Sequence, residues 1–272
     1  MPSSRVPGNC VRYGAGVVDE HQPEVSVLTP VFRPDREFFL EAWRSICAQE
    51  GLDWEWVLQF DSSAQDMRAW LPDEIRDDPR CRPAAAGNFG VAITRNLGIL
   101  RCRAPFVQCL DYDDILLPGA VAAALETLRA DPELAFCFGD AVDMLPDGTF
   151  ERRPAHKTLP VGRVEAGTIS DWYLAGKPHR LIFGSVMWRP EFVFAYGGWT
   201  ALPVSEDFGL SFAVVSQHPI AFIGRDTMHH RVHPGQFTAR PQQRALADLQ
   251  RPFLRSRLEA MEQVIGRPAG AR

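Results

Sequence analysis

The feature that most constrains the fold is a short apolar run that stops abruptly in acidic residues. The segment 106–118 reads FVQCLDYDDILLP and begins as a β-prone stretch typical of a buried strand. Because alternate side chains of an extended segment point to the same side, Asp111 and Asp113 are predicted to face one spot. Two carboxylates aimed at one point repel each other unless a cation or a shared proton lies between them. Oxygen ligands of this kind suit Mg²⁺ or Mn²⁺. A solvated acidic turn that leads into a helix at Pro118 explains the same pattern without a metal.

The first half of the chain alternates between strand-like and helix-like segments. Strands are predicted at 25–29, 54–60, 106–110 and 134–138, and helices at 35–49, 90–101 and 118–130. Pro30 is expected to break the first strand, and the proline-containing stretch 62–90 is expected to be irregular. This alternation predicts an α/β fold with a mostly parallel central sheet flanked by helices.

The pattern changes after about residue 140. It predicts a hairpin turn at 144–148, a short helix at 170–175, a strand at 181–188 and a short turn or helix at 190–196. A helix at 205–215, a strand at 220–232 and an amphipathic helix at 241–266 follow. We therefore divide the chain into a flexible arm (1–24), a first half (25–140), a smaller second half (141–240) and a C-terminal helix with its tail (241–272).

Composition excludes several classes of protein. A net charge of −5 argues against nucleic acid as the main partner. No apolar stretch is long enough to span a bilayer, and the first ten residues lack the apolar core of a secretory signal. The six cysteines are scattered, without a Cys-x-x-Cys pair. We expect a cytoplasmic, reduced protein of enzyme size.

Polar residues follow three of the predicted strands. Thr29, Asp61 and the pair Asp111/Asp113 stand at the strand ends, and ligands of an open parallel sheet bind outside the carboxyl ends of its strands. The three ends should open into one crevice. There Asp61 either accepts a hydrogen bond from a base or a ribose hydroxyl, or forms an Asx turn onto Ser63.

These residues belong to a longer ordered set that resembles the inverting glycosyltransferases of family 2, which have the GT-A fold. The segments that carry the resemblance are Thr29-Pro30-Val31-Phe32 ("T/I-P-V-Y/F"), Phe60-Asp61-Ser62-Ser63 ("D-D-G-S"), 90–98 ("G-x-x-x-A-R-N-x-G"), 110–118 ("L-D-x-D-D-x-x-x-P"), Gly198-Trp199 ("G-G-W/F") and Glu206-Asp207 ("E-D"). The resemblance covers residues 25–233 in the family's order. It departs at Phe60 and Ser62, where the family has Asp and Gly, and this departure concerns the nucleotide pocket more than the fold.

For the first half, the resemblance implies a nucleotide-sugar-binding region. Asp61 would pair with the nucleobase, in a pocket lined by Thr29, Pro30 and Phe32. Arg95 and Asn96 would support the nucleotide, Asp111 would lie near the ribose and the metal, and Asp113 would bind the Mn²⁺ or Mg²⁺ ion that bridges the diphosphate. The alternative for Arg95 is a salt bridge across a helix.

For the second half, the resemblance implies acceptor binding and the catalytic base. Asp207, beside Glu206, would deprotonate the acceptor hydroxyl, although acids after Ser205 also suit the first turn of a capped helix. Trp199 either stacks on a sugar of the acceptor or fills the core.

A histidine-rich segment, 229–233, follows near the end of the predicted strand 220–232. His233 and Arg231 are predicted to face the ligand, His233 as a metal ligand and Arg231 at the diphosphate, with His230 in reserve as a metal ligand. The alternative is a hydrated basic strand end.

The sequence thus favours a metal-dependent inverting glycosyltransferase. Its donor would be a nucleoside-diphosphate sugar, with UDP- or dTDP-sugars favoured, and its acceptor a small soluble molecule with a free hydroxyl. Two alternatives stay open. A nucleotidyltransferase would usually have a glycine-rich loop after the first strand, and 29–35 contains no glycine. A catalytically silent nucleotide-sugar-binding protein would bind the donor without turning it over.

Overall fold

The computed structural model describes residues 21–152, 159–176, 181, 183–236 and 241–266, so most of the predicted arm lies outside the described residues. The strands are β1 (Val25–Val31), β2 (Trp54–Phe60), β3 (Cys81–Ala85), β4 (Phe106–Cys109), β5 (Ile115–Leu116), β6 (Phe136–Met144), β7 (Phe150–Arg152), β8 (Gly162–Val164), β9 (Met187–Trp188) and β10 (Ile220–Arg231). The helices are α1 (Arg36–Cys47), α2 (Ala64–Trp70), α3 (Asp73–Arg76), α4 (Val91–Ile99), α5 (Ala120–Ala130), α6 (Thr168–Leu174), α7 (Pro190–Ala195), α8 (Glu206–Val215) and α9 (Pro241–Val264), with a 3₁₀ turn at Phe183–Ser185.

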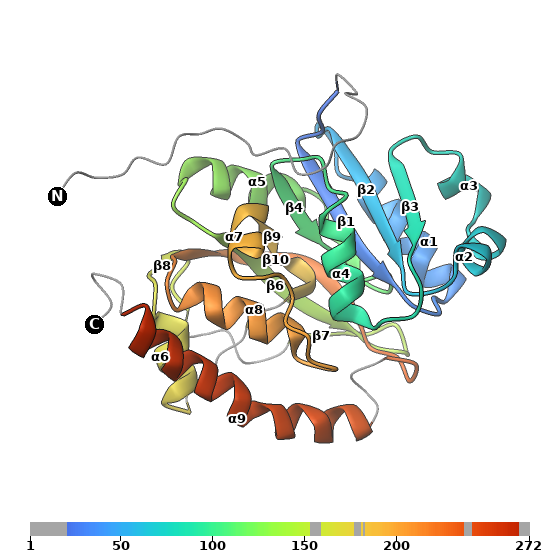
Figure 1. Ribbon diagram of the computed structural model, residues 1–272. Helices are drawn as coiled ribbons and strands as arrows, with labels where there is room; N and C mark the ends of the chain where they lie inside the picture. Colours follow the sequence, from blue (N-terminus) through green and yellow to red (C-terminus); the bar gives the residue numbers. More distant parts are fainter. Residues whose placement is uncertain (1–20, 153–158, 177–180, 182, 237–240, 267–272) are drawn as a thin grey trace.

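One sheet runs through both halves of the chain, in the order β3-β2-β1-β4-β9-β6-β10-β5 (Figure 1). The pairs β3–β2, β2–β1, β1–β4 and β6–β10 are parallel. Strand β9 lies antiparallel between β4 and β6, so these two also run in the same direction. The predicted mostly parallel sheet is confirmed, and the boundary drawn at residue 140 falls inside β6.

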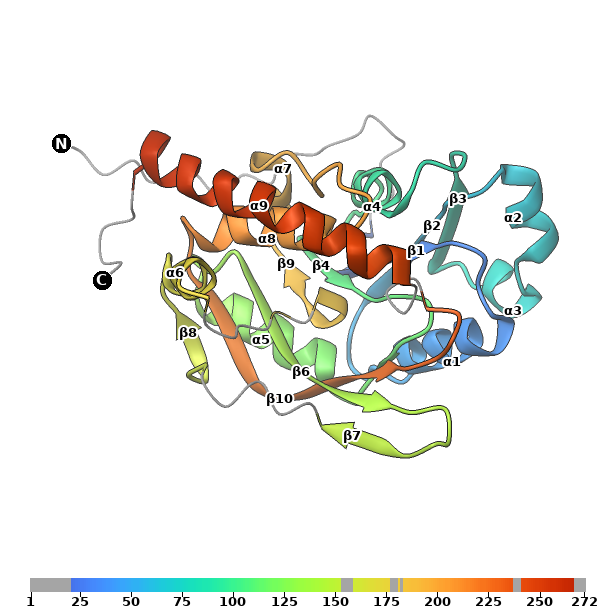
Figure 2. The same cartoon turned by 90° about the horizontal axis from the view of Figure 1, so that it is seen from below.

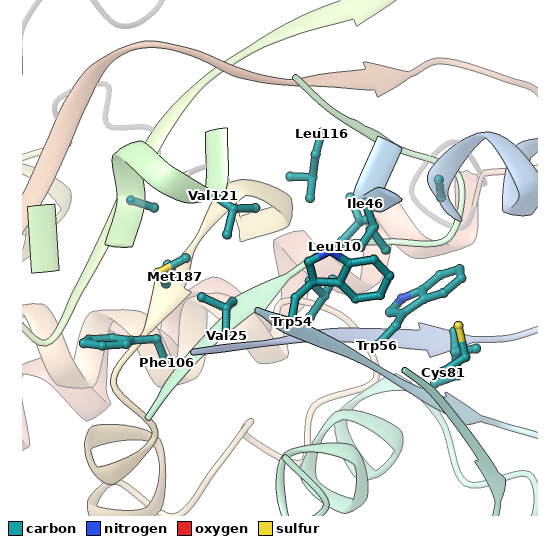
Figure 3. Close-up of a cluster of buried hydrophobic side chains, with 14 of the residues drawn as sticks. Val25, Ile46, Trp54, Trp56, Cys81, Phe106, Leu110, Leu116, Val121 and Met187 are labelled. Atoms are coloured by element: carbon teal, nitrogen blue, oxygen red, sulfur yellow. The ribbon is translucent and has the colours of Figure 1, made fainter. Parts of the chain in front are cut away.

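Helices cover both faces of the sheet, as Figures 1 and 2 show. Alternate residues of β1 and β2 face opposite sides, because side chains alternate along a strand. Val25 and Trp56 join the cluster with α1 and α5 that Figure 3 shows in part, whereas Leu28 and Val57 join the cluster beneath α4 and α8. These two buried layers cover the faces of the sheet and leave the ends of its strands uncovered.

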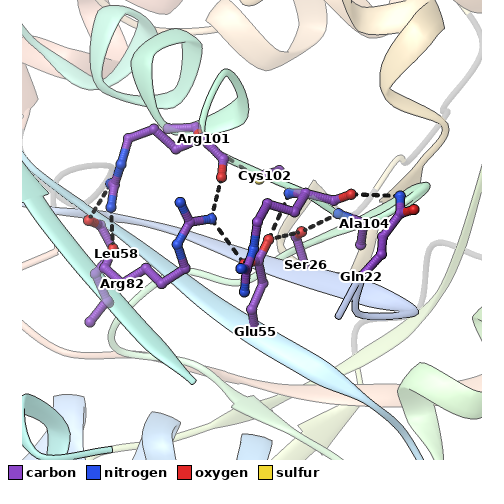
Figure 4. A network of polar contacts seen from close by, with 10 residues as sticks. Gln22, Ser26, Glu55, Leu58, Arg82, Arg101, Cys102 and Ala104 are labelled. Atoms are coloured by element: carbon purple, nitrogen blue, oxygen red, sulfur yellow. Dashed lines mark hydrogen bonds and ion pairs between the residues drawn. The ribbon is translucent and has the colours of Figure 1, made fainter. Parts of the chain in front are cut away.

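A buried ionic network fixes the amino-terminal end of the sheet (Figure 4). The Glu55 carboxylate is 1% exposed and accepts from Ser26 Oγ at 2.6 Å, Arg82 Nη1 at 2.9 Å, and both the backbone N–H and Nε of Arg103. Removing one partner of such a group typically costs about 3–5 kcal/mol, because a buried charge is left uncompensated. The network lies away from the carboxyl ends, where the predicted site residues stand.

The stretch 62–90 departs from the prediction, because it contains α2, α3 and strand β3. Strand β3 contains Pro83 and still pairs with β2, which is possible because β3 is the edge strand of the sheet. Pro30 likewise does not end β1. It pairs with Gln59 beyond Leu28, the last residue of β1 that pairs with β4, so its missing N–H breaks no ladder on that side.

The second half follows the prediction in its helices and in the turn between β6 and β7, where Leu145 N–H donates to the Thr149 carbonyl at 2.8 Å. The strand predicted at 181–188 is wrong over most of its length, since 183–185 form a 3₁₀ turn and only Met187 and Trp188 pair in the sheet. Among the described helices, none combines the length and apolar character needed to cross a bilayer.

Candidate active site

A pocket of about 540 Å³ opens at the carboxyl ends of β1 and β2. Its lining comes from the turns after these strands, from α2 and from the loop before α4: Val31, Phe32, Arg33, Pro34, Phe60, Asp61, Ser62, Ser63, Asp66, Met67, Trp70, Gly87 and Asn88. This is the edge at which an open parallel sheet binds ligands.

Two of the four residues predicted for the nucleotide pocket line it, namely Phe32 and Asp61. Thr29 does not, because it is fully buried and its hydroxyl accepts a hydrogen bond from Trp56 Nε1 at 2.8 Å. Pro30 is also absent from the lining. The assignment of Thr29 to the pocket wall is therefore wrong, and that of Pro30 stays a prediction. Both lie in β1 itself rather than in the turn beyond it.

Asp61 makes a different local contact from the Asx turn considered above. Its Oδ1 accepts from the backbone N–H groups of Phe89 at 2.6 Å and Gly90 at 3.2 Å, and its Oδ2 accepts from Gly90 at 3.1 Å. Ser63 instead caps α2, accepting from the N–H of Asp66 at 3.1 Å. Asp61 thus fixes the start of α4 while its carboxylate also forms part of the pocket wall.

The sequence analysis missed the pocket residues on α2, Asp66, Met67 and Trp70, because 62–90 was expected to be irregular. Arg33 was also missed. It has a positive φ of 44°, and its guanidinium lies 5.1 Å from the centroid of the Phe32 ring. Strained backbone of this kind is concentrated at functional sites.

Arg95 connects the two halves of the site. This buried side chain donates from Nη2 to Asp111 Oδ1 at 2.8 Å and from Nη1 to Glu206 Oε1. Burial works against the charged form, but the two carboxylates outweigh it and raise the pKa of Arg95 above its ordinary value. The arginine therefore neither bridges turns of one helix nor points into the nucleotide pocket. It joins the end of β4 to the start of α8.

Asp207 lies deep among protein atoms, yet part of its surface remains exposed. Burial and the adjacent charge of Glu206 raise its pKa to about 7, while the charge of Arg95 and the Phe208 N–H act in the opposite direction. A carboxylate with a pKa near neutrality accepts a proton far more readily than an ordinary aspartate. Glu206 itself is 6% exposed and forms an ion pair with Arg95, whereas Asp207 keeps part of its surface exposed.

The helix start at 205–207 is not a capped turn of the expected kind. The Ser205 side chain makes no capping hydrogen bond, and its φ is +61°, a conformation that non-glycine residues rarely adopt. The Ser205 cap of the alternative is therefore not formed, although Glu206 and Asp207 do lie in the first turn of α8.

Asn96 and Trp199 contact each other through the backbone of Trp199. The Asn96 amide donates to the Trp199 carbonyl at 3.0 Å and accepts from its N–H at 2.8 Å. The Trp199 ring is 4% exposed and belongs to the core cluster beneath α8. Its prediction as a platform for the acceptor is wrong, because its ring face is covered by protein.

The acidic turn after β4 is held by residues from the end of β10. Asp113 Oδ2 lies 3.0 Å from His233 Nε2. Burial and the charge of Asp111 raise the pKa of Asp113, and the contact with His233 partly offsets this. Asp114, missed by the sequence analysis, is 2% exposed and accepts from the Arg231 N–H at 2.9 Å. No sequence signal links residues 117 positions apart.

Arg231 supports this turn rather than an anion. Its Nε donates to the Asp113 carbonyl at 2.9 Å, its Nη2 pairs with Glu41, and its guanidinium lies 4.2 Å from the Phe38 ring centroid. The prediction that Arg231 faces the diphosphate is therefore wrong. The charge of Arg231 is already neutralised by an ion pair with Glu41.

His230 is engaged at both ring nitrogens. Nδ1 lies 2.8 Å from Asp143 Oδ1, and Nε2 lies 3.2 Å from Gln236 Nε2. The structure thus ties His230 to β6 and leaves His233 as the histidine beside the acidic turn. Gln236 and Asp143 gave no sequence signal, because they act only through these contacts.

The residues at the turn fit a divalent cation that also takes ligands from a substrate. Asp111, Asp113 and His233 supply carboxylate oxygens and an imidazole nitrogen, and burial together with the charge of Asp111 raises the pKa of Asp113. Within the described ranges, no three His, Cys, Asp or Glu side chains gather closely enough to hold an ion alone. This arrangement suits Mg²⁺ or Mn²⁺, which are commonly bound by one or two carboxylates together with substrate phosphates.

Comparisons with known proteins agree with this site. A family model described as glycosyl transferase family 2 matches residues 26–179. The O-antigen biosynthesis protein RfbC of Myxococcus xanthus is 34% identical over 121 residues, which are 44% of this chain and 10% of that protein. The GalNAc(5)-diNAcBac-PP-undecaprenol beta-1,3-glucosyltransferase of Campylobacter jejuni is 31% identical over 123 residues, 44% of this chain and 38% of that protein. The chain thus spans well under half the length of these curated relatives.

Solved structures show the same fold. The S. aureus TarS 1–349 structure in complex with UDP-GlcNAc superposes with a TM-score of 0.64 at 12% identity, covering 89% of this chain and 73% of that one. The complex with UDP gives a TM-score of 0.61 at 14% identity, over 88% and 71% of the two chains. At these identities the likeness concerns the arrangement of the sheet and its helices.

Proposed function

The chain belongs to glycosyl transferase family 2, and we propose that it transfers a sugar from a nucleoside-diphosphate donor to a hydroxyl acceptor with inversion at the anomeric carbon. The fold of the S. aureus TarS complexes, which hold UDP-GlcNAc and UDP, supports a nucleotide-sugar donor. The matched segment of the Campylobacter jejuni glucosyltransferase supports sugar transfer as the reaction.

The observation that carries the proposal is the place and chemistry of Asp207. It stands beside Glu206, which Arg95 joins to the acidic turn, and its pKa is raised to about 7. An acceptor hydroxyl must lose its proton as it attacks, and a carboxylate near neutrality takes that proton efficiently. A protein that only bound the donor would have no need of this residue.

In the proposed reaction the two halves do different work. Phe32 and Asp61 hold the nucleoside in the pocket, and the acidic turn faces the diphosphate. Asp207 takes the proton of the acceptor oxygen while that oxygen forms its bond to the anomeric carbon and the bond to the diphosphate breaks. A single displacement of this kind inverts the anomeric centre. A divalent cation bound by Asp111, Asp113 and His233 would neutralise the charge that develops on the departing diphosphate.

UDP- or dTDP-sugars are the favoured donors, and a small soluble molecule is the favoured acceptor. The test is a thermal-shift screen of UDP-, dTDP- and GDP-sugars with and without Mn²⁺, followed by measurement of nucleoside diphosphate release. A ligand that binds the folded state raises the midpoint of unfolding. Stabilisation by a donor together with its turnover supports the proposal. Stabilisation without turnover, with water and with a panel of sugar acceptors, indicates a silent binding protein, and release of pyrophosphate from a nucleoside triphosphate indicates a nucleotidyltransferase.

A further inference from the structure

Two adjacent residues of α4, Arg95 and Asn96, hold both ends of the loop that leads to Asp207. Asn96 makes a pair of hydrogen bonds to the backbone of Trp199, at 2.8 and 3.0 Å, which uses the carbonyl oxygen and the amide nitrogen of its side chain. Arg95 pairs with Glu206 at the other end. The loop 199–206 is thus tied to one helix at its first and last residues, and Asp207 follows directly.

The approach of the loop to α4 is close enough to require glycine. Gly198 has a φ of +79°, and a Cβ atom at this position would overlap the Asn96 side-chain oxygen. Both observations restrict residue 198, because L side chains rarely adopt this φ and the space is already filled. Asn96 is therefore fitted to the loop and not directed at the nucleotide pocket, whose lining does not include it.

Inside the loop, further hydrogen bonds involve Thr200, whose carbonyl accepts from the Leu202 N–H at 2.7 Å. The Thr200 N–H donates to the Glu206 carbonyl at 3.3 Å, and Thr200 Oγ1 accepts from Arg257 Nη1 at 2.6 Å. At its end Ser205 is held in a left-handed conformation that is strained for a residue with a side chain. Such a conformation persists only where the surrounding contacts enforce it, and the ion pair of Arg95 with Glu206 is the contact next to it.

We propose that Arg95 and Asn96 are positioning residues for the base Asp207, and that they do not contact the nucleotide. The proposal rests on the proposed function. Arg95 also donates to Asp111, so the arginine sets the distance between the acidic turn, where the donor's diphosphate would lie, and the helix that carries the base. The two residues thus fix the position of the acceptor side of the site relative to the donor side.

The test compares Asn96→Ala with Asn88→Ala. Asn88 lies in the pocket lining eight residues earlier, so it is the matched control for an asparagine placed to meet the nucleotide. Because the acceptor is unidentified, the reaction followed is hydrolysis of UDP-glucose with Mn²⁺, read as UDP release. UDP affinity is measured by calorimetry.

Asn96→Ala is expected to lower kcat by about 10- to 100-fold, the effect of a catalytic group displaced by about 1 Å, while the Kd for UDP stays within about twofold of wild type. Asn88→Ala is expected to show the opposite pattern, with a raised Kd for UDP and a raised KM for UDP-glucose. A third variant, Gly198→Ala, disturbs the same contact from the loop side and should resemble Asn96→Ala. The two losses should combine to less than their product, because they act on one contact.

Arg95→Lys adds a measurement that distinguishes a positioning role from a merely structural one. Lysine keeps the charge beside Asp207 but lacks the planar fork that reaches two carboxylates. It should lower kcat without moving the acid limb of the pH profile. Backbone hydrogen exchange over 199–207 should rise in both Asn96→Ala and Arg95→Lys, whether or not the protein turns over.

Several results would overturn the inference. A weakened UDP affinity in Asn96→Ala with unchanged kcat would make Asn96 a nucleotide ligand. An unchanged kcat per folded molecule, with only a lower midpoint of unfolding, would make the contact purely structural. Absence of UDP release by the wild type would contradict the proposed function alone. In that case the Kd for UDP and the hydrogen exchange of Asn96→Ala still test the positioning role. An unchanged Kd with faster exchange over 199–207 supports that role, and a raised Kd contradicts it.

Discussion

The two halves of the site are built in different ways. In residues 25–140 the groups that face the crevice follow directly from parallel strands, so that Asp61 and the acidic turn lie where the strand order puts them. In residues 141–240 the short strands β7, β8 and β9 pair antiparallel with their neighbours, while β10 pairs in parallel with β6. Asp207 is placed there by side chains from the first half. One half is positioned by its own backbone pattern, and the other by contacts from α4.

This difference explains why substitutions in the two halves should have different signatures. A change at a strand end alters what binds there and leaves the neighbouring strands in place. A change in the contacts of α4 or α8 moves the base relative to a donor that still binds. We therefore expect binding effects from the first half and rate effects from the second.

The largest effect is expected from Asp207→Asn. The substitution keeps the shape of the side chain but removes its capacity to take a proton, so kcat should fall by about 100- to 10,000-fold while the Kd for UDP stays near wild type. Single-turnover measurements of the rate and calorimetric measurements of the Kd for UDP, made on the same preparation, check the two expectations. Loss of UDP binding in this variant would erase the contrast between the two halves.

The same variant should be more stable than wild type at alkaline pH. Burial and Glu206 raise the pKa of Asp207 to about 7, whereas an aspartate in an unfolded chain has a pKa of about 3.9. The folded protein therefore holds a proton that the unfolded chain has released, and the free energy of unfolding falls as the pH rises from about 4 to 7. Asparagine does not titrate, so the gain in unfolding midpoint of Asp207→Asn should be larger at pH 8 than at pH 4.5. An equal gain at both values would contradict the raised pKa.

The second effect belongs to the first half. Asp113→Ala should weaken UDP binding in the presence of Mn²⁺ by more than about tenfold and remove its dependence on the metal, because Asp113 stands beside Asp111 and His233 at the acidic turn. Calorimetric titration with Mn²⁺ and with EDTA measures both. His230→Ala is the control, since His230 is bound to Asp143 and Gln236 and should leave the metal dependence intact. An Asp113→Ala protein with wild-type affinity and an unchanged response to Mn²⁺ would rule out the metal assignment.

The sequence predicted the first half better than the second, and the reason is physical. The strand–helix alternation specifies a parallel sheet, and the sheet brings Asp61 and Asp113 to one edge without further information. What the pattern missed in this half, β3 and α2, is an edge strand with a proline and a seven-residue helix, both of which lack a clear period. The contacts of Arg95 with Glu206 and of Asn96 with Trp199 could not be found in this way, because these partners lie more than 100 residues away. The local sequence pattern contains no information about contacts between residues so far apart.

Trp199 and Arg231 show that residue type alone can predict a binding role that the structure does not support. Both are residue types that often bind ligands, and the structure places one in the core and the other in a pair with Glu41. Residue type predicted a possible role, and burial and pairing decided it. Asp207 was predicted from its place in the family motif, while the raised pKa that suits it to the role comes from Glu206 and from burial.

A smaller effect is expected from Glu206→Gln. The negative charge of Glu206 raises the pKa of Asp207, so its removal should lower that pKa and move the acid limb of the kcat profile to lower pH. Glutamine keeps a hydrogen-bond acceptor for Arg95, and turnover should survive with a moderate loss. The pH dependence of UDP-glucose hydrolysis measures the shift. If Glu206→Gln abolished turnover and Asp207→Asn retained it, the base would be Glu206 and the family motif would be shifted by one residue.

The smallest effect is the choice of nucleobase, which concerns the pocket of the first half alone. Asp61 is placed to accept from the N3–H of uracil or thymine, whereas guanine offers two donors, N1–H and N2–H. We expect the single donor to suit Asp61 better. Among the described residues, its Oδ1 already accepts from the backbone N–H groups of Phe89 and Gly90, and its Oδ2 accepts from Gly90 alone. A second donor from guanine would have to compete for an oxygen that is already used.

The expected preference is therefore modest. One net hydrogen bond is worth about 0.5–1.5 kcal/mol, so UDP and dTDP should bind about two- to tenfold more tightly than GDP in a competition titration. Ser62→Ala, in the same pocket wall, is the control for a general change of the pocket and should shift all three nucleotides alike. Asp61→Asn should reduce the preference, because an amide has one acceptor oxygen where the carboxylate has two, and the Phe89 and Gly90 amides would occupy it. A tighter complex with GDP than with UDP would mean that the base is read by another group of the pocket, and Asp66, the second carboxylate in its lining, is then the residue to change next.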